Sequence, residues 1–410
     1  MASYAYSFYE VLLEPALCRL GLVQPGFGDP TYGRLKVPYT ERERKWIYDN
    51  PRVHVTERRV SAGVAEKGTR TTKEEAAKKV ADKAAVGGDI WYNVWEIPQE
   101  IQRAKLNSDV VLVHGMNDYG GKLGPIAMPY LEAGFRVIVF DLPGHGRSAG
   151  LHGYAPSMRL LPEALHAVMR DVLKFDGDLA RGRKMFLTGT SMGAFTCLYY
   201  AALYSPIPKT NGKANGNAAH DEGGAEADDS TVPAHTDDLY RPNLAGIAVT
   251  APMITIAPES MPHWTIHKTA EILRTFAGRL PLSKGVKGKT SDDPRIEIEF
   301  HKDPLTYKGN LRVGTGLAIW DGIHHLQQLP HLITCPVALH HGSKDRATNA
   351  QGTRDFFPRL GSSKKTLKIW EGLEHVMQKY VDGMDEADTA RTHEVIHSLR
   401  DFFLELARES

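Results

Sequence analysis

The chain has 410 residues, of which 42% are hydrophobic and 24% are charged, a composition typical of a globular enzyme. Its 50 basic and 49 acidic residues nearly cancel, so charge gives no reason to expect a nucleic-acid partner. The three cysteines, Cys18, Cys197 and Cys335, are widely spaced and odd in number, which argues against a disulfide framework or a structural metal site. The sequence therefore favours a cytoplasmic location.

Residues 1–50 are expected to form an N-terminal extension. The first residues are apolar but lack the basic start of a targeting signal, and Glu10 and Glu14 interrupt the apolar run. We expect a short helix laid over the domain. The open alternative is a peripheral membrane contact, made by this helix or by the cap described below. The helix side chains concerned are Tyr4, Phe8, Leu12 and Leu13.

The rest of the chain alternates between apolar strands and helical stretches. Residues 51–65 and 90–98 are rich in β-branched and aromatic residues and predict two strands, with the charged segment 66–88 inserted between them as an exposed helix. From residue 109, short apolar runs alternate with helical patterns, which predicts a mostly parallel sheet buried on both faces. These strand candidates are 109–115, 135–141, 184–189, 244–252, 335–342 and 367–372.

Two segments interrupt this alternation. Residues 206–241 are polar and nearly without large apolar side chains, so we expect a disordered surface insertion. Residues 254–329 contain helical patterns and are expected to form a cap over the carboxyl edge of the sheet, where open α/β sheets bind substrates. The expected core therefore consists of residues 51–253 and 330–410.

A short glycine-flanked pattern predicts a nucleophile. Gly189-Thr190-Ser191-Met192-Gly193 follows one strand candidate and precedes a helical run. This strand–turn–helix context is the one that a nucleophile elbow requires. The flanking glycines have a steric reason, because the strand and the helix approach each other closely at such a turn. We therefore predict that Ser191 is a nucleophile.

An acid and a base follow in the order that such a serine needs. A serine hydroxyl attacks only when a base accepts its proton, and a carboxylate must orient that base. Asp345 follows the strand candidate 335–342, and His375 follows the strand candidate 367–372. Their order and strand-end positions predict Asp345 as the acid and His375 as the base. The alternatives are a loop-capping carboxylate and an incidental loop histidine.

Two backbone amides are predicted to bind the oxyanion of a tetrahedral intermediate. One belongs to Met192, directly after the nucleophile. The other belongs to Met116, in the turn that follows the strand candidate 109–115. The alternative for His114-Gly115 is a tight turn alone, and the two interpretations are compatible.

Together these motifs resemble the monoacylglycerol lipase (lysophospholipase-like) family of α/β-hydrolases. The resemblance spans about residues 90–405 and implies the α/β-hydrolase fold, a Ser191–His375–Asp345 triad, no cofactor, and a cap over an apolar acyl-chain tunnel. The block Asp303-Pro304-Leu305 inside the cap is more specific to the family than the serine motif. The matching blocks are VHGMNDYGG, FDLPGHGRSAG, LTGTSMGA, HKDPLTYKGNLRVGTG, HHGSKDRAT and KTLKIWEGLEHV.

Several positions depart from the family pattern. Such lipases usually carry His before the nucleophile, where this chain has Thr190, and Asp118, Tyr119 and Lys122 replace a Glu, a His and an Arg of the usual oxyanion loop. These polar groups lie near the expected alcohol-binding end, so the alcohol is left open. The cap leucines named below have packing within the cap as their alternative. The candidate substrate-binding residues are Asn117, Asp118, Thr190, Met253, Leu305, Leu311 and Leu317.

The sequence thus predicts a serine hydrolase that cleaves carboxylic esters through an acyl-enzyme intermediate. The expected partner is a small lipid or ester of the monoacylglycerol or lysophospholipid type. One alternative is an esterase or lactonase acting on a small non-glycerol ester. The other is a ligand receptor of the same fold without efficient turnover. The sequence leaves the oligomeric state open.

Overall fold

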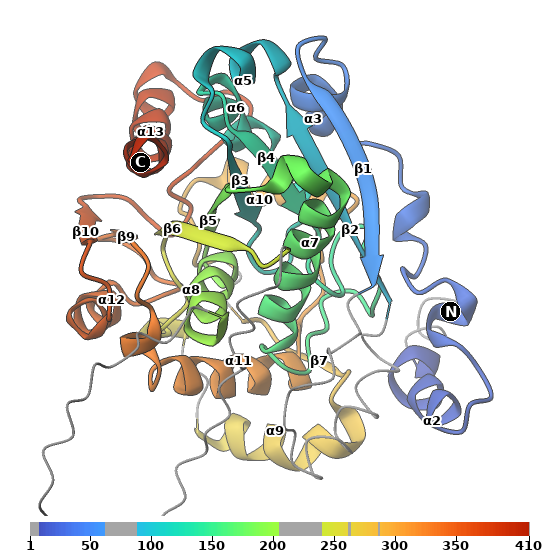
Figure 1. Cartoon of the computed structure of the whole chain (residues 1–410). Coiled ribbons are helices and arrows are strands. Elements are labelled where there is room, and N and C mark those ends of the chain that lie inside the picture. The colour runs from blue at the N-terminus through green and yellow to red at the C-terminus, as the bar shows by residue number, and fades with distance from the viewer. Residues whose placement is uncertain (1–7, 62–87, 205–239, 261–263, 286–287, 410) are drawn as a thin grey trace, which may run out of the picture.

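An eight-stranded sheet forms the centre of the molecule (Figure 1). The computed structural model describes residues 8–61, 88–204, 240–260, 264–285 and 288–409. The strands are β1 (His54–Ser61), β2 (Asp89–Glu96), β3 (Ser108–Val113), β4 (Arg136–Phe140), β5 (Lys184–Thr190), β6 (Asn243–Thr250), β9 (Val337–Gly342) and β10 (Lys365–Trp370). In the order β1-β2-β4-β3-β5-β6-β9-β10, the first two pairs are antiparallel and the later pairs are parallel. The predicted mostly parallel sheet is confirmed.

The register of the sheet brings four strand ends together. Thr190 pairs with Thr250, and Thr250 pairs with His340, so the chain leaves β5 and β6 beside the last residues of β9. On the far side of β9, Gly342 pairs with Trp370 at the end of β10. Because parallel strands share one carboxyl edge, the residues that follow these four strands meet at that edge.

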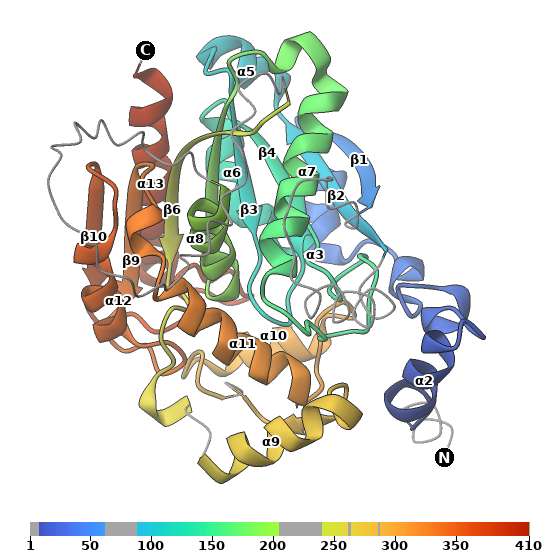
Figure 2. The ribbon, with the colours of Figure 1, turned by 60° about the horizontal axis from the view of Figure 1, so that its bottom comes forward.

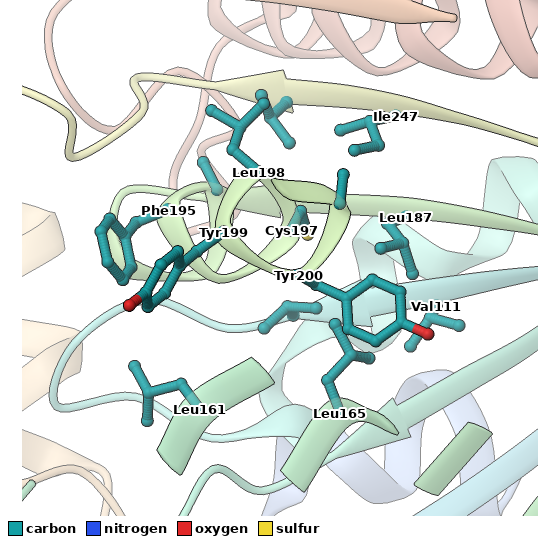
Figure 3. Close-up of a cluster of buried hydrophobic side chains, with 14 of the residues drawn as sticks. Val111, Leu161, Leu165, Leu187, Phe195, Cys197, Leu198, Tyr199, Tyr200 and Ile247 are labelled. Atoms are coloured by element: carbon teal, nitrogen blue, oxygen red, sulfur yellow. The ribbon is translucent and has the colours of Figure 1, made fainter. Parts of the chain in front are cut away.

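Helices cover both faces of the sheet, as its continuous apolar strands require. They are α5 (Pro98–Ala104), α6 (Gly124–Glu132), α7 (Leu160–Asp176), α8 (Met192–Tyr204), α12 (Ala350–Phe356) and α13 (Glu386–Arg408). One core cluster includes side chains of α7, α8 and α12, and a second includes α6 and α13. Figure 3 shows the first cluster, in which Leu198 of α8 lies near Ile247 of β6, and Leu165 of α7 lies near Tyr200.

In its described residues, the segment predicted as a cap contains three α-helices and two short strands that pair antiparallel. These are α9 (Trp264–Ala277), β7 (Pro281–Ser283), α10 (Pro294–Lys302), β8 (Leu311–Arg312) and α11 (Val313–Leu326). Helix α9 packs against α11, and both lie below the sheet in the view of Figure 2. The backbone amide of Ala155 donates to Thr315 Oγ1 at 2.9 Å, which ties α11 to the core. This arrangement supports the proposed cap.

The N-terminal segment packs against both the core and the cap segment. The predicted short helix is present as the helical turns η1 (Tyr9–Leu13) and α2 (Glu14–Arg19). The buried carboxylate of Glu14 accepts a hydrogen bond from Arg279 at 2.9 Å, and Arg279 follows α9. Arg34 donates to three backbone carbonyls in the loop 146–150. Residues far apart in the sequence are therefore joined through this segment.

Two predicted insertions lie almost wholly outside the described residues. The charged segment 66–88 and the polar segment 206–241 nearly coincide with the undescribed ranges 62–87 and 205–239, so both predictions stay predictions. The strands that flank the first insertion, β1 and β2, pair antiparallel in unbroken register.

Candidate active site

Ser191 lies in a tight turn between β5 and α8. Its backbone φ is +59°, a left-handed value that non-glycine residues rarely adopt. The backbone amide of Ser191 donates to the carbonyl of Thr250 at 3.2 Å, and its carbonyl accepts from the amide of Met253 at 3.2 Å. A Cβ atom added at Gly189 would lie 2.6 Å from the carbonyl oxygen of Val113. The glycine is therefore required by the close approach of neighbouring backbone.

Asp345 follows β9, His375 follows β10, and their side chains are hydrogen-bonded. His375 Nδ1 lies 2.7 Å from Asp345 Oδ2, and both side chains are buried. Asp345 Oδ1 accepts from the amides of Ala347 and Thr348 at 2.8 and 2.9 Å. Burial alone would raise the pKa of Asp345, but hydrogen bonds from His341 and His375 outweigh it and hold that pKa well below its usual range. The carboxylate is therefore ionised at neutral pH.

The bond to Asp345 determines which nitrogen of His375 can act as a base. An ionised carboxylate only accepts hydrogen bonds, so Nδ1 carries the proton and Nε2 of the neutral ring is left unprotonated. Among the hydrogen bonds of the described residues, none joins Ser191 Oγ to this Nε2 atom. Hydrogen bonds of this kind are often long before substrate binds and shorten in the substrate complex.

Thr190 connects the serine turn to the loop that carries His375. Its Oγ1 lies 2.7 Å from Thr250 Oγ1 and 3.3 Å from Oε1 of Gln378, a residue in the same loop as His375. Thr190 occupies the position before the nucleophile, where lipases of the family that the sequence resembles usually carry His. In this chain, the position therefore links two neighbouring strand ends with the loop after β10.

The two amides predicted to bind an oxyanion have no hydrogen-bond acceptor among the described residues. Met192 is the first residue of α8, where backbone N–H groups have no partner within the helix. In the described part of the chain, neither the Met192 amide nor the Met116 amide donates to another protein group. The Met116 turn approaches the serine, because a Cβ atom added at Gly115 would lie 3.8 Å from Ser191 Cβ. Both amides are available to a ligand oxygen.

The cap segment is fastened to the loop that carries Met116. Asn117 has a left-handed φ of +66°, and its carbonyl accepts from the amide of Tyr307 at 3.0 Å. The hydroxyl of Tyr119 donates to Asp303 Oδ2 at 2.9 Å. The Asp303-Pro304-Leu305 block therefore holds this part of the cap segment against the loop.

The N-terminal segment reaches the same junction. Thr40 Oγ1 lies 3.2 Å from the hydroxyl of Tyr119. Arg42 forms an ion pair with Glu299 of α10 and donates to the carbonyl of Tyr380, in the loop after His375. Four parts of the chain therefore meet around Tyr119, and no sequence pattern indicated that they would.

The remaining predicted substrate-binding residues differ in position. Met253 is buried and bonded through its amide to Ser191, so it lies beside the candidate nucleophile. Asp118 lies in the loop that carries Met116, with its Oδ1 atom 3.5 Å from Lys122 Nζ. The side chains from the cap segment are buried or partly buried there, in agreement with the packing alternative: Leu305, Leu311 and Leu317.

His114 and His145 are buried, and each lies in a turn beside glycine residues. His114 Nε2 accepts from the amide of Leu142 at 2.9 Å, which ties the end of β3 to the end of β4. Burial lowers the pKa of His114 to about 4 and the pKa of His145 to about 3, so both rings are neutral at neutral pH. Among the residues that the structure describes, no group of three or more His, Cys, Asp or Glu side chains is arranged to hold a metal ion.

Two side chains that the sequence reasoning did not single out also contact the candidate acid. His341 Nε2 lies 3.1 Å from Asp345 Oδ2, and Thr348 Oγ1 donates to the same oxygen at 2.8 Å. Both lie within four residues of Asp345 in the chain. A turn directly after a strand folds such near neighbours together, and this signal was present in HHGSKDRAT.

Comparison with known families gives a match to the family described as "Serine aminopeptidase, S33" (Hydrolase_4). The match covers residues 104–213 and 231–379, which is more than half of the chain. It includes Ser191, Asp345 and His375. The chain belongs to this family, and with the sheet described above it is a hydrolase of the α/β-hydrolase fold.

Individual relatives narrow the class. Human monoglyceride lipase is 24% identical over 276 residues, which cover 66% of this chain and 76% of that protein. Caffeoylshikimate esterase of Arabidopsis thaliana is 27% identical over 278 residues, covering 66% of this chain and 71% of that protein. A solved soluble variant of monoglyceride lipase from Saccharomyces cerevisiae shares the fold, with a TM-score of 0.57, 18% identity, and coverage of 85% of this chain and 96% of that one. The chain is a monoacylglycerol lipase-like α/β-hydrolase.

Proposed function

We propose that the chain hydrolyses carboxylic esters of the monoacylglycerol or lysophospholipid type, with Ser191 as nucleophile, His375 as base and Asp345 as acid. The observation that carries the proposal is the buried His375–Asp345 pair, joined at 2.7 Å, at the sheet edge where the left-handed Ser191 turn also lies. The class of carboxylic ester hydrolase rests on the family and on its lipase relatives.

The proposed reaction has two halves. Ser191 Oγ attacks the ester carbonyl carbon while His375 Nε2 accepts the hydroxyl proton, and Asp345 stabilises the resulting imidazolium. The carbonyl oxygen becomes an oxyanion that accepts hydrogen bonds from the amides of Met116 and Met192. His375 then gives its proton to the leaving alcohol as the C–O bond breaks. Water then attacks the acyl carbonyl carbon while His375 accepts its proton, and His375 returns that proton to Ser191 Oγ as the bond to the serine breaks and the carboxylic acid leaves.

A non-glycerol ester is the second candidate substrate. The loop expected at the alcohol end departs from the lipase pattern at Asp118, Tyr119 and Lys122. In the structure, Asp118 pairs with Lys122, and Tyr119 bonds to Asp303, so these groups have partners of their own. One relative is an esterase by name rather than a glyceride lipase.

Replacing Ser191 tests the proposed nucleophile. Ser191→Ala should abolish labelling by a fluorophosphonate probe and lower monoacylglycerol hydrolysis by a factor on the order of 10⁴ or more, because the triad acts as a unit. Ser343→Ala is the matched control, since Ser343 is an exposed serine close in sequence to the candidate acid. The hydroxyl of Ser343 donates to Glu371 at 2.9 Å. The control variant should label and turn over normally.

The substrate profile separates the alternatives. Long-chain monoacylglycerols should be hydrolysed faster than acetate esters, lactones and aromatic esters. A folded wild-type protein that the probe does not label would contradict the nucleophile. Equal rates on long-chain and acetate esters would contradict the lipase assignment. Lipid binding without turnover would favour a receptor of the same fold.

We also propose a reversible contact between the N-terminal segment and a lipid surface. In the described ranges, no helix is both long and apolar enough to cross a membrane. Several large apolar side chains of this segment are exposed, among them Leu20 at 71%, Leu22 at 68% and Phe27 at 63%. Of the four residues predicted for this contact, Phe8, Leu12 and Leu13 are exposed, and Tyr4 lies outside the described residues.

The neighbouring cap segment extends the same surface. Helix α9 packs against η1 and exposes Ile272. Figure 1 shows α2 and α9 at the same end of the molecule. Exposed apolar side chains gathered at one end are typical of a protein that meets a membrane or a partner, and an enzyme acting on monoacylglycerols meets its substrate in lipid.

A further inference from the structure

A second histidine contacts the carboxylate of Asp345. His341 is the penultimate residue of β9 and is fully buried. Its Nε2 atom lies 3.1 Å from Asp345 Oδ2, the same oxygen that His375 Nδ1 approaches at 2.7 Å. On the other side of the ring, His341 Nδ1 lies 2.8 Å from Thr353 Oγ1 in α12. The ring therefore bridges a helix and the candidate acid.

These two contacts favour one tautomer of the neutral ring. Because an ionised carboxylate only accepts, the proton of His341 lies on Nε2 and points at Asp345. Nδ1 is then an acceptor, and the hydroxyl of Thr353 can donate to it. Thr353 thereby orients a donor toward the carboxylate, as partners in the outer shell of a metal site orient its ligands.

When several donors share one carboxylate oxygen, each of them weakens the hydrogen bonds that the oxygen accepts from the others. Each donor stabilises the ionised carboxylate and reduces the negative charge available to the bond with His375. Thr348 Oγ1 is the third donor, at 2.8 Å from Asp345 Oδ2. The position and basicity of this oxygen therefore depend on His341 as well as on the base.

Among the described residues, the titratable groups with the largest effect on the pKa of Asp345 are His341 from β9 and His375 from the loop after β10. Helix α12 and the turn before it contribute the uncharged hydroxyls of Thr353 and Thr348. Arg346, a charged residue of that turn, pairs instead with Asp292 and Glu374.

We propose that His341 is a positioning residue: it holds Asp345 Oδ2 in line with His375 Nδ1 and limits how tightly the acid stabilises the protonated base. The inference rests on the proposed roles of Asp345 and His375. His341 touches neither the substrate nor the reacting atoms. Its effect therefore reaches the reaction only through the carboxylate.

The test replaces His341 by a side chain that cannot donate and by one that can. In His341→Phe, the carboxylate loses a donor, His375 holds its proton more tightly, and the acidic limb of the kcat/KM profile should move to higher pH. The fall in kcat should be on the order of 10- to 100-fold, the cost usual for orienting partners, with little change in KM. His341→Gln has an amide that can donate to Asp345, so its kcat and its acidic limb should both lie close to those of the wild type.

Fluorophosphonate labelling supplies a readout that needs no assigned substrate. The rate of Ser191 labelling, followed against pH, should show the same displaced limb in His341→Phe. If wild-type protein is not labelled, the proposed function has failed. If it is labelled but its natural ester proves to be different, the inference about His341 is still tested.

His340→Phe is the matched control. His340 is the adjacent residue of the same strand, is similarly buried, and accepts from Trp370 Nε1 at 3.1 Å rather than touching Asp345. This variant should lower the melting temperature without moving the acidic limb. If His341→Phe also lowers stability and leaves the limb unmoved, His341 is only structural and the proposal is wrong.

Thr353→Val keeps the test decisive if His341→Phe does not fold. Thr353 is buried, and valine keeps its shape while removing the hydroxyl that orients His341. The acidic limb should move in the same direction as in His341→Phe, by a smaller amount. An unchanged pH profile in Thr353→Val, or a profile in His341→Gln displaced as far as a donor-free variant would be, would overturn the proposal.

Discussion

His114 and His145 show how single buried side chains connect this fold to pH. Burial lowers the pKa of His114 to about 4 and of His145 to about 3 in the folded protein, whereas an unfolded histidine titrates near pH 6.5. Because the folded pKa values are depressed, the unfolded chain binds protons first as pH falls. The stability contributed by the neutral rings is therefore full above about pH 6.5 and is lost toward pH 4 and below.

The free energy of unfolding should accordingly fall between about pH 6.5 and pH 4, by up to about 1.4 kcal/mol per pH unit for each of the two histidines. His145→Asn removes one titrating ring while keeping a donor for the Pro143 carbonyl that His145 contacts at 3.0 Å. Its slope, measured by urea unfolding across this range, should be shallower than that of the wild type. Equal slopes in the wild type and in His145→Asn would contradict the assignment.

Residue-level prediction from the sequence is possible where a side chain follows a recognisable strand. Ser191, Asp345 and His375 each come directly after an apolar run, so their common edge could be anticipated before any contact was known. The partners of Thr190 and Tyr119 could not. Their hydrogen bonds join residues that are distant in the chain, and a single polar side chain carries no periodic signal.

At the level of elements, two segments hold each other in place beside the serine. The loop that carries Met116 and the cap segment are joined by the hydrogen bonds of Asn117 with Tyr307 and of Tyr119 with Asp303. Since Tyr119 is fully buried, its hydroxyl has no water to replace a lost partner. The connection should therefore resist opening of the cap segment at this point.

Tyr119→Phe should weaken this connection. Loss of the bond to Asp303 leaves a carboxylate oxygen with one donor fewer, and we expect a destabilisation of about 1–2 kcal/mol with a larger effect on KM than on kcat. A double-mutant cycle with Asp303→Ala, which removes the acceptor, measures the coupling between the two side chains. Tyr39→Phe, which loses an exposed bond to Glu57, is the control and should be nearly neutral. Strictly additive effects of Tyr119→Phe and Asp303→Ala would show that the bond contributes nothing.

The apolar periodicity of the sequence was its most informative feature for predicting strands and helices. The strand candidate 335–342 corresponds to β9 (Val337–Gly342), and the helical patterns expected within residues 254–329 include α11 (Val313–Leu326). Such runs reflect the burial of the element, and they can be recognised within a short window of sequence. The docking of the N-terminal segment was not predictable in detail, because its main contacts, Glu14 with Arg279 and Arg34 with the 146–150 loop, are polar and long-range.

For the whole molecule, the exposed apolar side chains at one end raise the question of where the enzyme meets its substrate. Leu20→Ser combined with Leu22→Ser should lower partitioning onto phosphatidylcholine vesicles by on the order of tenfold, since each leucine brings apolar area to the lipid. Hydrolysis of a dispersed short-chain ester should be unchanged. Vesicle co-sedimentation measures the first quantity and a p-nitrophenyl ester the second.

Leu179→Ser is the matched control for this surface. Leu179 is 76% exposed, as much as the two leucines, but it follows α7 and lies outside the N-terminal and cap segments. Its replacement should leave vesicle binding as it is. If the double variant binds vesicles as well as the wild type does, the N-terminal segment is not the lipid contact.

The way the N-terminal segment is fastened also sets an order for folding during synthesis. It is synthesised before its partners: Arg34 needs the loop 146–150, Glu14 needs Arg279, and Arg42 needs the carbonyl of Tyr380. Each partner is made later than the one before. This segment can therefore complete its docking only after Tyr380 has been made, and until then its apolar side chains are open to chaperones or lipid.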